Sequence, residues 1–259
     1  MKKKLASIII TNYNKEKYIK KTIASAIAQS YKNIEILVFD DKSNDGSTKI
    51  IKDFKGIKKI FNRRRKLNSA PLNQLNAIIK AFLKSKGEYI FFLDGDDEIK
   101  KNKVKEIIKI FSFNKKKDLV QDKPYLSKEK KILKLKIKKH HFSIWPSIYP
   151  TSCIAIRRRF MTEFVKFSQK KKFSNLEIDA RIIIFSFLKK KMKVINNSYT
   201  FYNHDKNGIT SNYLKFRKNW WKKRYEAFLY MKYLSKKIGL KFKKGPDYYL
   251  TQLINSYFK

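Results

Sequence analysis

An alternation of two kinds of segment runs through the first hundred residues and constrains the fold more than any other feature of the sequence. Apolar runs of strand length occupy 5–10, 34–39, 57–61 and 88–93. Segments with apolar residues at helical spacing occupy 16–28, 72–83 and 104–113. Strands that alternate with helices predict an α/β fold with a doubly wound, mostly parallel sheet flanked by helices. In such sheets, ligands bind beyond the carboxyl ends of the strands.

The second half of the chain is less regular. Its predicted elements are a loop with one or two edge strands over 115–141, a strand at 154–156, a helix from there to 167, a helix over 176–188 and a late strand over 194–202. From residue 213 the chain is helical, basic and aromatic. We therefore predict one domain over 1–212 and a C-terminal helical extension over 213–259. Within the domain, Ser47 is predicted to cap a short helix after an Asn-Asp-Gly turn.

The charge balance limits the partners that the protein can have. Its 63 Lys and Arg against 21 Asp and Glu give a net charge of +42 at pH 7. Such a charge suits nucleic acid, an anionic membrane face or a polyanionic substrate, or it reflects lysines that are simply solvated. The hydrophobic fraction of 42% is enough for a folded core.

Two further features concern the compartment. Cys153 is the one cysteine of the sequence, which excludes an intrachain disulfide and is typical of a reducing cytoplasm. The basic start followed by a short apolar run indicates a first strand rather than a signal peptide. No uncharged apolar stretch approaches the length of a membrane span. We expect a cytoplasmic protein, with peripheral attachment to the inner face of the membrane as an alternative.

Carboxylates follow two of the predicted strands. Asp41 comes after the second strand, and Asp94, Asp96 and Asp97 come after the fourth. Because both strand ends face the same crevice, these carboxylates repel one another unless a cation joins them. A divalent metal such as Mg²⁺ or Mn²⁺ takes oxygen ligands and keeps positions open for phosphate oxygens. The alternative is a solvated acidic turn, which the strand running directly into Asp94 makes the weaker reading.

Three motifs, in order and at characteristic spacing, resemble the family 2 inverting glycosyltransferases of GT-A fold. They are Ser-Ile-Ile-Ile-Thr-Asn-Tyr-Asn at 7–14, Asp-Asp-Lys-Ser-Asn-Asp-Gly-Ser at 40–47 and Gly-Glu-Tyr-Ile-Phe-Phe-Leu-Asp-Gly-Asp-Asp at 87–97. The resemblance is strong over 5–100, weaker through 212 and absent in the tail. It implies a nucleotide-binding half over 1–100 and an acceptor half over 101–212.

The resemblance also implies roles for residues of the first half. Thr11 and Tyr13 would lie against the base of a nucleotide-sugar donor, with Tyr13 stacking on it. Asp41 would accept a hydrogen bond from the ring N–H of the base, which favours uracil or thymine over cytosine. Asp94 would lie by the ribose and the metal, and Asp96 would bind the metal directly. Where the family often has an Asn and a Gly, this chain has Ile79 and Ala81, which puts a donor contact there in doubt.

In the second half, the segment Asn-Leu-Glu-Ile-Asp-Ala-Arg at 175–181 resembles the part of the family that carries the general base. Its acidic pair is spread over Glu177 and Asp179, and we assign the base to Asp179 because an apolar helix follows it. Tyr-Asn-His at 202–204 resembles a late motif over the donor phosphates, where His204 would bind the metal or a phosphate.

Together these features predict an inverting transfer of a sugar from a nucleotide-diphosphate sugar, with UDP as the expected nucleotide, to a hydroxyl of a glycan, lipid-linked or surface-polymer acceptor. No nucleic-acid partner is expected. One alternative is a nucleotidyltransferase of similar fold, although the glycine-rich phosphate loop of those enzymes is missing at 11–14. Another is a non-enzymatic nucleic-acid-binding protein, which leaves the carboxylates unexplained.

The tail predicts a membrane contact. Trp220, Trp221, Tyr225, Phe228 and Leu229 fall on overlapping helical faces and are interleaved with basic residues. Aromatic side chains next to cations suit the headgroup boundary of an anionic bilayer. The alternative is that these aromatic residues pack on the domain.

Overall fold

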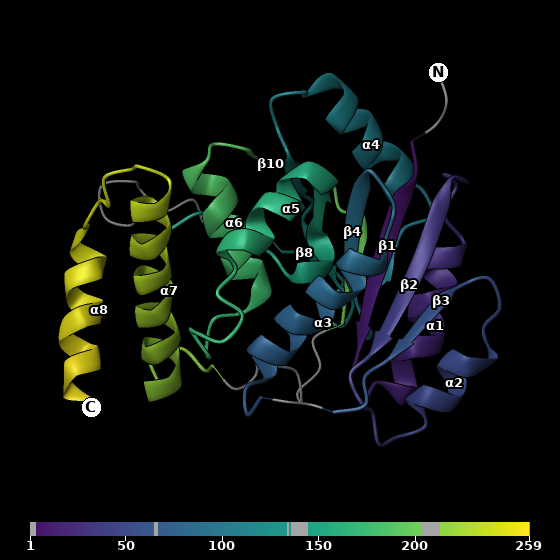
Figure 1. The fold of residues 1–259 in the computed structure, drawn as a ribbon, viewed down its shortest axis with the longest axis horizontal. Coiled ribbons are helices and arrows are strands. Elements are labelled where there is room, and N and C mark those ends of the chain that lie inside the picture. Colours follow the sequence, from purple (N-terminus) through teal and green to yellow (C-terminus); the bar gives the residue numbers. More distant parts are fainter. Residues whose placement is uncertain (1–3, 65–66, 134, 136–144, 204–212, 259) are drawn as a thin grey trace.

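The computed structural model describes residues 4–64, 67–133, 135, 145–203 and 213–258. A seven-stranded sheet with helices on both faces forms its centre (Figure 1). The strands of this sheet, in spatial order, are β10 (Met192–Val194), β6 (Leu119–Gln121), β9 (Ile154–Arg157), β4 (Tyr89–Asp94), β1 (Ala6–Asn12), β2 (Ile34–Asp40) and β3 (Lys58–Phe61). The predicted α/β fold with a mostly parallel sheet is therefore confirmed.

Strand direction follows the order of the chain. β1 pairs in parallel with β2 and β4, and β2 pairs in parallel with β3. β9 is antiparallel to both of its neighbours, β4 and β6. A second sheet of short strands lies beside the first, in the order β5 (Glu98–Ile99), β11 (Thr200–Tyr202), β7 (Pro124–Leu126) and β8 (Lys131–Ile132).

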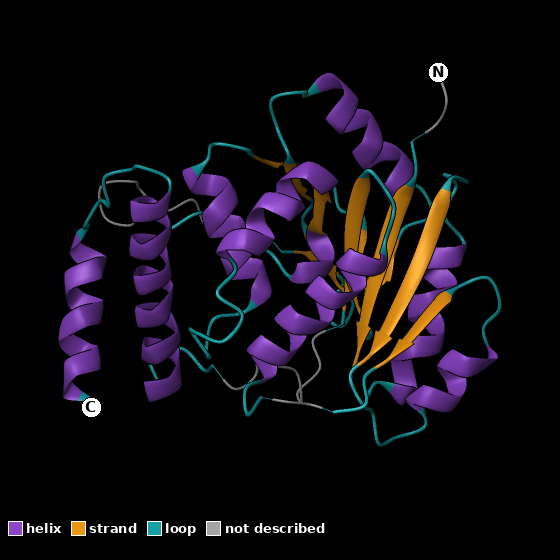
Figure 2. Ribbon diagram, viewed as in Figure 1, coloured by secondary structure: helices purple, strands orange, loops and turns teal. Residues whose placement is uncertain are grey.

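The helices lie on the two faces of the large sheet, except for the last two of the chain, which stand to one side of it (Figure 2). They are α1 (Glu16–Ile27), α2 (Ser47–Asp53), α3 (Ala70–Lys84), α4 (Lys103–Phe113), α5 (Arg158–Phe167), α6 (Ile178–Leu188), α7 (Lys218–Lys237) and α8 (Pro246–Tyr257). α3 begins two residues before the predicted helix over 72–83, because the Ser69 hydroxyl accepts a hydrogen bond from the Leu72 N–H at 3.2 Å and Pro71 lies in the first turn.

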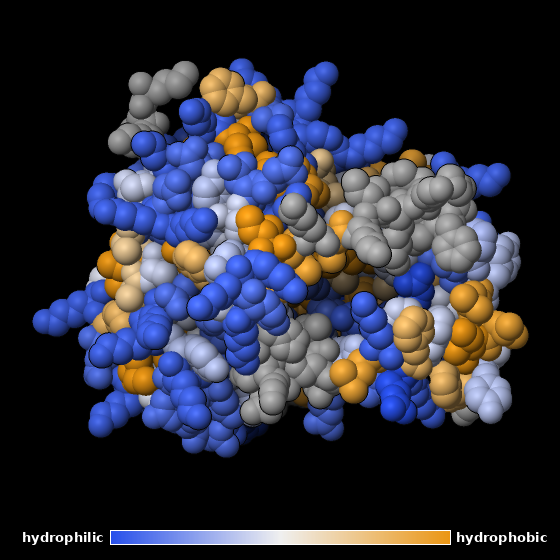
Figure 3. Space-filling model, turned by 180° about the vertical axis from the view of Figure 1, so that it is seen from behind, coloured by the Kyte–Doolittle hydropathy of each residue, from blue (hydrophilic) through white to orange (hydrophobic). Residues whose placement is uncertain are grey.

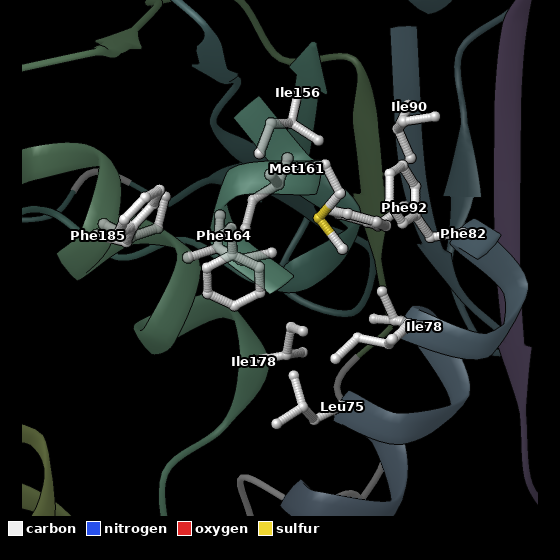
Figure 4. Close-up of a cluster of buried hydrophobic side chains, with 14 of the residues drawn as sticks. Leu75, Ile78, Phe82, Ile90, Phe92, Ile156, Met161, Phe164, Ile178 and Phe185 are labelled. Atoms are coloured by element: carbon white, nitrogen blue, oxygen red, sulfur yellow. The ribbon is translucent and has the colours of Figure 1, made fainter. Parts of the chain in front are cut away.

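Alternate residues of the central strands supply two hydrophobic clusters, one on each face. Ile9 belongs to the cluster beneath α3, α5 and α6, whereas Ile8 and Ile10 belong to the cluster beneath α1 and α4. Figure 4 shows the first cluster, in which side chains of α3, β4, β9, α5 and α6 meet. This packing fixes the strand ends that carry the site.

Three predictions of local structure were wrong. β6 was expected at an edge, but it lies between β9 and β10 inside the large sheet. The single late strand over 194–202 is two strands, β10 and β11, in different sheets. Ser47 does not cap α2 but begins it after Gly46, and its hydroxyl accepts a hydrogen bond from the Lys15 N–H at 3.0 Å.

The segment after residue 213 is helical, as predicted. α7 packs against α6, and Ala227, Tyr230, Met231 and Leu234 are part of the first hydrophobic cluster. Of the aromatic residues predicted to contact a membrane, Trp221 and Phe228 are buried, so packing on the domain is correct for these two. No helix in the described part of the chain is long and apolar enough to cross a membrane.

Candidate active site

The loops after β1 and β2 are tied together at the carboxyl end of the sheet. The register places Asn12 beside Asp40, and the Asn12 amide donates to the Asp40 carboxylate at 2.7 Å. Asp40 also accepts from the backbone N–H and the hydroxyl of Ser43, at 3.0 and 2.6 Å. Asp40 is therefore a buried structural carboxylate that shapes the second loop.

Its neighbour Asp41 is also buried, in the loop that follows β2. The Asp41 N–H donates to the Asn12 carbonyl at 2.8 Å, and its carboxylate accepts from the Asn62 amide at 2.7 Å. The ring of Tyr13 is 38% exposed in the adjoining loop. The structure thus brings the predicted base-contacting residues Tyr13 and Asp41 to neighbouring loops at one end of the sheet.

Asp94, the last residue of β4, joins three elements. Its Oδ1 accepts hydrogen bonds from the Thr11 hydroxyl at 3.1 Å and from the Gln74 amide of α3 at 2.8 Å. Burial and the charge of Asp96 raise the pKa of Asp94 to about 7. Asp94 is therefore held rigidly in a place where a second negative charge is already close.

Asp96 and Asp97 follow, with different partners. The Asp96 Oδ2 lies 2.6 Å from the Lys15 Nζ. The fully buried Asp97 accepts from the Ser152 hydroxyl at 2.6 Å and from the Asn203 N–H at 2.9 Å, and burial with the charges of Asp96 and Asp94 raises its pKa well above the usual value. Asp97 therefore fixes the loop, whereas the Asp96 carboxylate pairs with the Lys15 side chain.

Asp179 lies in the first turn of α6, as predicted. Burial and the neighbouring charge of Glu177 raise the pKa of Asp179 to about 7, and the charge of Asp94 acts in the same direction. Lys223 of α7, which forms an ion pair with Glu177, lowers the pKa of Asp179 in part. The two acidic residues of this segment therefore differ, since Glu177 forms an ion pair with Lys223 whereas burial raises the pKa of Asp179.

Tyr202 ends β11 next to the loop that carries two of these carboxylates. Burial raises the pKa of its hydroxyl, and so do the charges of Asp97, Asp94, Asp96 and Asp179. The next residue, Asn203, donates its N–H to the Asp97 carboxylate at 2.9 Å and its side-chain amide to the Asp96 carbonyl at 2.7 Å. β11 is therefore tied to the loop after β4. His204, the other predicted ligand, lies outside the described residues.

The donor chemistry of the crevice fits a hard divalent ion in part. Asp94 and Asp96 are two positions apart, and burial, with the charge of Asp96 as the second cause, raises the pKa of Asp94. A cation would relieve the repulsion between the two carboxylates. Within the described part of the chain, no group of three His, Cys, Asp or Glu residues is arranged to hold a metal ion. Asp94 and Asp96 would hold the ion, with phosphate or water oxygens completing its coordination.

Four residues of the site were missed in the sequence: Lys15, Gln74, Asn203 and Lys223. Two of them are next to or inside motifs that were singled out, since Lys15 directly follows the motif at 7–14 and Asn203 is the middle residue of the motif at 202–204. Gln74 is an amide on a helix whose register against β4 only the folded chain defines. Lys223 is one lysine in a lysine-rich helix, and nothing in the sequence separates it from its neighbours.

Comparison with sequences identifies relatives of part of the chain. Over 93 residues it is 41% identical to the UDP-Glc:alpha-D-GlcNAc-diphosphoundecaprenol beta-1,3-glucosyltransferase WfaP of Escherichia coli, covering 36% of each chain. Over 105 residues it is 34% identical to the putative teichuronic acid biosynthesis glycosyltransferase TuaG of Bacillus subtilis, covering 40% of each. The matched segments thus span at most two fifths of these relatives.

Solved structures share the fold over more of the chain. Residues covering 87% of it superpose on Staphylococcus aureus TarS in complex with UDP-GlcNAc, with a TM-score of 0.60, 15% identity and 66% of that chain covered. The mannosyltransferase PcManGT of Pyrobaculum calidifontis, in complex with GDP-Man and Mn²⁺, gives a TM-score of 0.62 at 13% identity, covering 94% of this chain and 66% of that one. The glycosyl transferase family 2 profile matches residues 7–190. With this match, the sheet order and the strand-end carboxylates, the chain belongs to glycosyl transferase family 2.

Proposed function

We propose that this protein transfers a sugar from a UDP-linked donor to a hydroxyl group, with inversion at the anomeric carbon. The proposal rests on two carboxylates at the carboxyl end of β4 and a third at the start of α6. Asp94, which accepts hydrogen bonds from Thr11 of β1 and Gln74 of α3, stands two residues before Asp96, and Asp179 lies in the first turn of α6. Two of these carboxylates suit a metal-bound diphosphate, and the third stands apart from them on α6. An inverting transfer needs metal ligands and a separate general base, because a direct displacement requires a base but no nucleophilic carboxylate.

The loops after β1 and β2 would bind the donor. Tyr13 would stack on the base and Thr11 would lie beside it, while the Asp41 carboxylate would accept the ring N–H of uracil. Thr11 also donates to Asp94, which couples the base-binding loop to the diphosphate end of the crevice. Magnesium or manganese held by Asp94 and Asp96, and by His204 as predicted, would neutralise charge on the departing nucleoside diphosphate.

Asp179 would act as the general base. A carboxylate with a pKa of about 7 is ionised for much of the time near neutral pH and is basic enough to take a proton from a hydroxyl in the transition state. Lys223 and Glu177 would keep the segment before α6 in place through their ion pair.

The acceptor class follows from the relatives by analogy. WfaP is named for an acceptor linked to diphosphoundecaprenol, and TuaG for teichuronic acid biosynthesis. A lipid-linked glycan or a surface polymer is therefore the acceptor that we propose. Residues 1–212 would form the transferase domain, and residues 213–259 an extension of it.

Nucleotide-dependent thermal stabilisation tests the donor and the metal. A ligand that binds the native state raises Tm in proportion to the logarithm of its concentration over Kd. We expect UDP with Mn²⁺ to raise Tm more than GDP with Mn²⁺, and EDTA or Asp96→Ala to remove the effect. Asp53→Ala is the matched control, because Asp53 is an exposed acidic residue of α2. Equal stabilisation by UDP after both treatments would contradict the metal bridge.

A further inference from the structure

In the C-terminal helix α8, the distribution of polar and apolar residues is the reverse of that in an ordinary surface helix. The residues that α8 buries are polar, namely Asp247, Thr251 and Asn255, which repeat at a spacing of four. Most of its exposed residues are apolar or aromatic, namely Tyr249, Leu250, Leu253 and Tyr257, and Ser256 is the exposed polar side chain among them. A surface helix normally places these two classes the other way round.

The buried polar face has a specific partner in α7. The Arg224 guanidinium donates to the Asp247 carboxylate at 2.7 Å and to the Thr251 hydroxyl at 3.0 Å. The ring of Tyr248 packs edge-on against Phe228, with the ring centroids 5.3 Å apart. These contacts fix the rotation of α8 about its own axis, so its apolar face points away from α7.

The exposed face is extensive and uncharged. Leu253 is 70% exposed and Tyr257 is 87% exposed. Residues 248–258 contain no Lys, Arg, Asp or Glu, so nothing charged would have to leave water if this face were covered. Figure 3 shows hydrophobic side chains gathered at the right-hand edge of that view, where α8 lies, with hydrophilic ones around them. A contiguous apolar patch of this kind marks an interaction surface.

The charge around the patch indicates the partner. Residues 213–258 carry 12 Lys and Arg against 2 Asp and Glu, a net charge of 12 − 2 = +10. Both acidic side chains are engaged inside the fold, Asp247 with Arg224 and Glu226 with Asn175. The exposed Lys241, Lys243 and Lys244 lead directly into α8. A second copy of this chain would bring the same positive charge against them, whereas an anionic surface would be attracted.

We infer that the exposed face of α8 docks the protein on an anionic lipid bilayer. Leu250 and Leu253 would enter the boundary between headgroups and acyl chains, and Tyr249 and Tyr257 would lie at headgroup level, where an amphipathic ring has one wet end. The lysines before α8 would contact the anionic headgroups. The tail thus binds lipid through its second helix, while α7, where the sequence placed the contact, is the element that anchors α8 to the domain.

Flotation of the purified full chain with vesicles tests this inference. The probes are phosphatidylcholine vesicles with and without phosphatidylglycerol, and neither donor nor acceptor is present, so the result is independent of the proposed sugar transfer. We expect binding to the anionic vesicles and on the order of tenfold weaker binding to the neutral ones. Leu250→Gln with Leu253→Gln should lower the partition coefficient on anionic vesicles by roughly tenfold or more, since two leucines would no longer leave water.

The matched control is Leu83→Gln with Phe113→Gln, which removes two exposed apolar side chains from α3 and α4. This variant should bind as the unchanged protein does, and the Tm of each variant checks that it is folded. Equal binding of both variants to anionic vesicles would overturn the inference, because charge alone would then suffice. A concentration-dependent dimer that Leu250→Gln with Leu253→Gln dissociates, without vesicle binding, would assign the face to a second copy instead.

Discussion

Substitutions of Glu177 and Asp179 test which of the two carboxylates is the general base. Asp179→Asn removes the proposed base but keeps the size of the side chain and the start of α6. We expect kcat to fall by about 10²–10⁴-fold, with the Kd for UDP and Mn²⁺ unchanged. Glu177→Gln is the matched control, and it should cost much less, since Glu177 pairs with Lys223. Should the two effects be reversed, Glu177 is the base.

The raised pKa of Asp179 predicts opposite pH dependences for kcat and for the stability of the fold. Because the pKa of Asp179 is about 7, kcat should rise as the pH increases through about 7 and then level off. Stability should change the other way. The folded-state pKa lies above the unfolded value near 3.8, so the contribution of this group to stability is present below about pH 4 and is lost as the pH rises through about 7. Asp179→Asn should remove that loss, so its Tm advantage over the unchanged protein should be larger at pH 8 than at pH 5.

The ion pair between Lys15 and Asp96 leads to a prediction about the affinity of the site for a divalent metal. The Lys15 ammonium group lies 2.6 Å from the Asp96 carboxylate, so a divalent ion that binds Asp96 must displace it. Lys15→Met should tighten binding of Mn²⁺ alone by roughly tenfold, since a hydrogen bond between charged groups contributes about 1.5–3 kcal/mol and water recovers part of it. Electron paramagnetic resonance of free Mn²⁺ measures this directly. Lys17→Met, at an exposed position of α1, is the control, and weaker binding in Lys15→Met would show that Lys15 assists the ion.

At the scale of elements, Lys103 joins the two sheets below the site. This fully buried lysine at the start of α4 lies 2.9 Å from the Asp122 carboxylate, and it donates to the Ser152 carbonyl and the Thr200 hydroxyl, both at 2.6 Å. Lys103→Met should cost about 3–5 kcal/mol in urea unfolding, because Asp122 is left buried without its cation.

Two comparison variants make this prediction specific. Lys105→Met, two positions away and exposed, should cost little. Adding Asp122→Asn to Lys103→Met should restore part of the loss, since the uncompensated charge is then gone. If Lys105→Met cost as much as Lys103→Met, the loss would come from helix propensity rather than from the buried pair.

The strands differ in how well the sequence alone predicts them. β1, β2 and β4 are buried on both faces, so their side chains form continuous apolar runs that local pattern is able to reveal. β6 is a strand of three residues whose identity depends on pairing with β9 and β10, which are distant in the sequence. The motif carboxylates were placed correctly at the carboxyl ends of two strands, β2 and β4, whereas Lys103, one of many lysines, gains its role only from three distant partners.

The net charge acts on the molecule as a whole. Folding brings 63 basic and 21 acidic residues into a compact volume, whereas unfolding separates them, so self-repulsion lowers the free energy of unfolding. Raising NaCl from about 0.01 M to about 0.1 M shortens the Debye length from about 30 Å to about 10 Å. Tm should then rise by about 2–4 °C, the shift that about 1 kcal/mol produces in a domain of this size. The buried pair of Lys103 and Asp122 is screened little and should not offset this gain. Potassium glutamate should act like NaCl if screening is the cause, while a fall in Tm in both salts would mean that attractive surface pairs outweigh the repulsion.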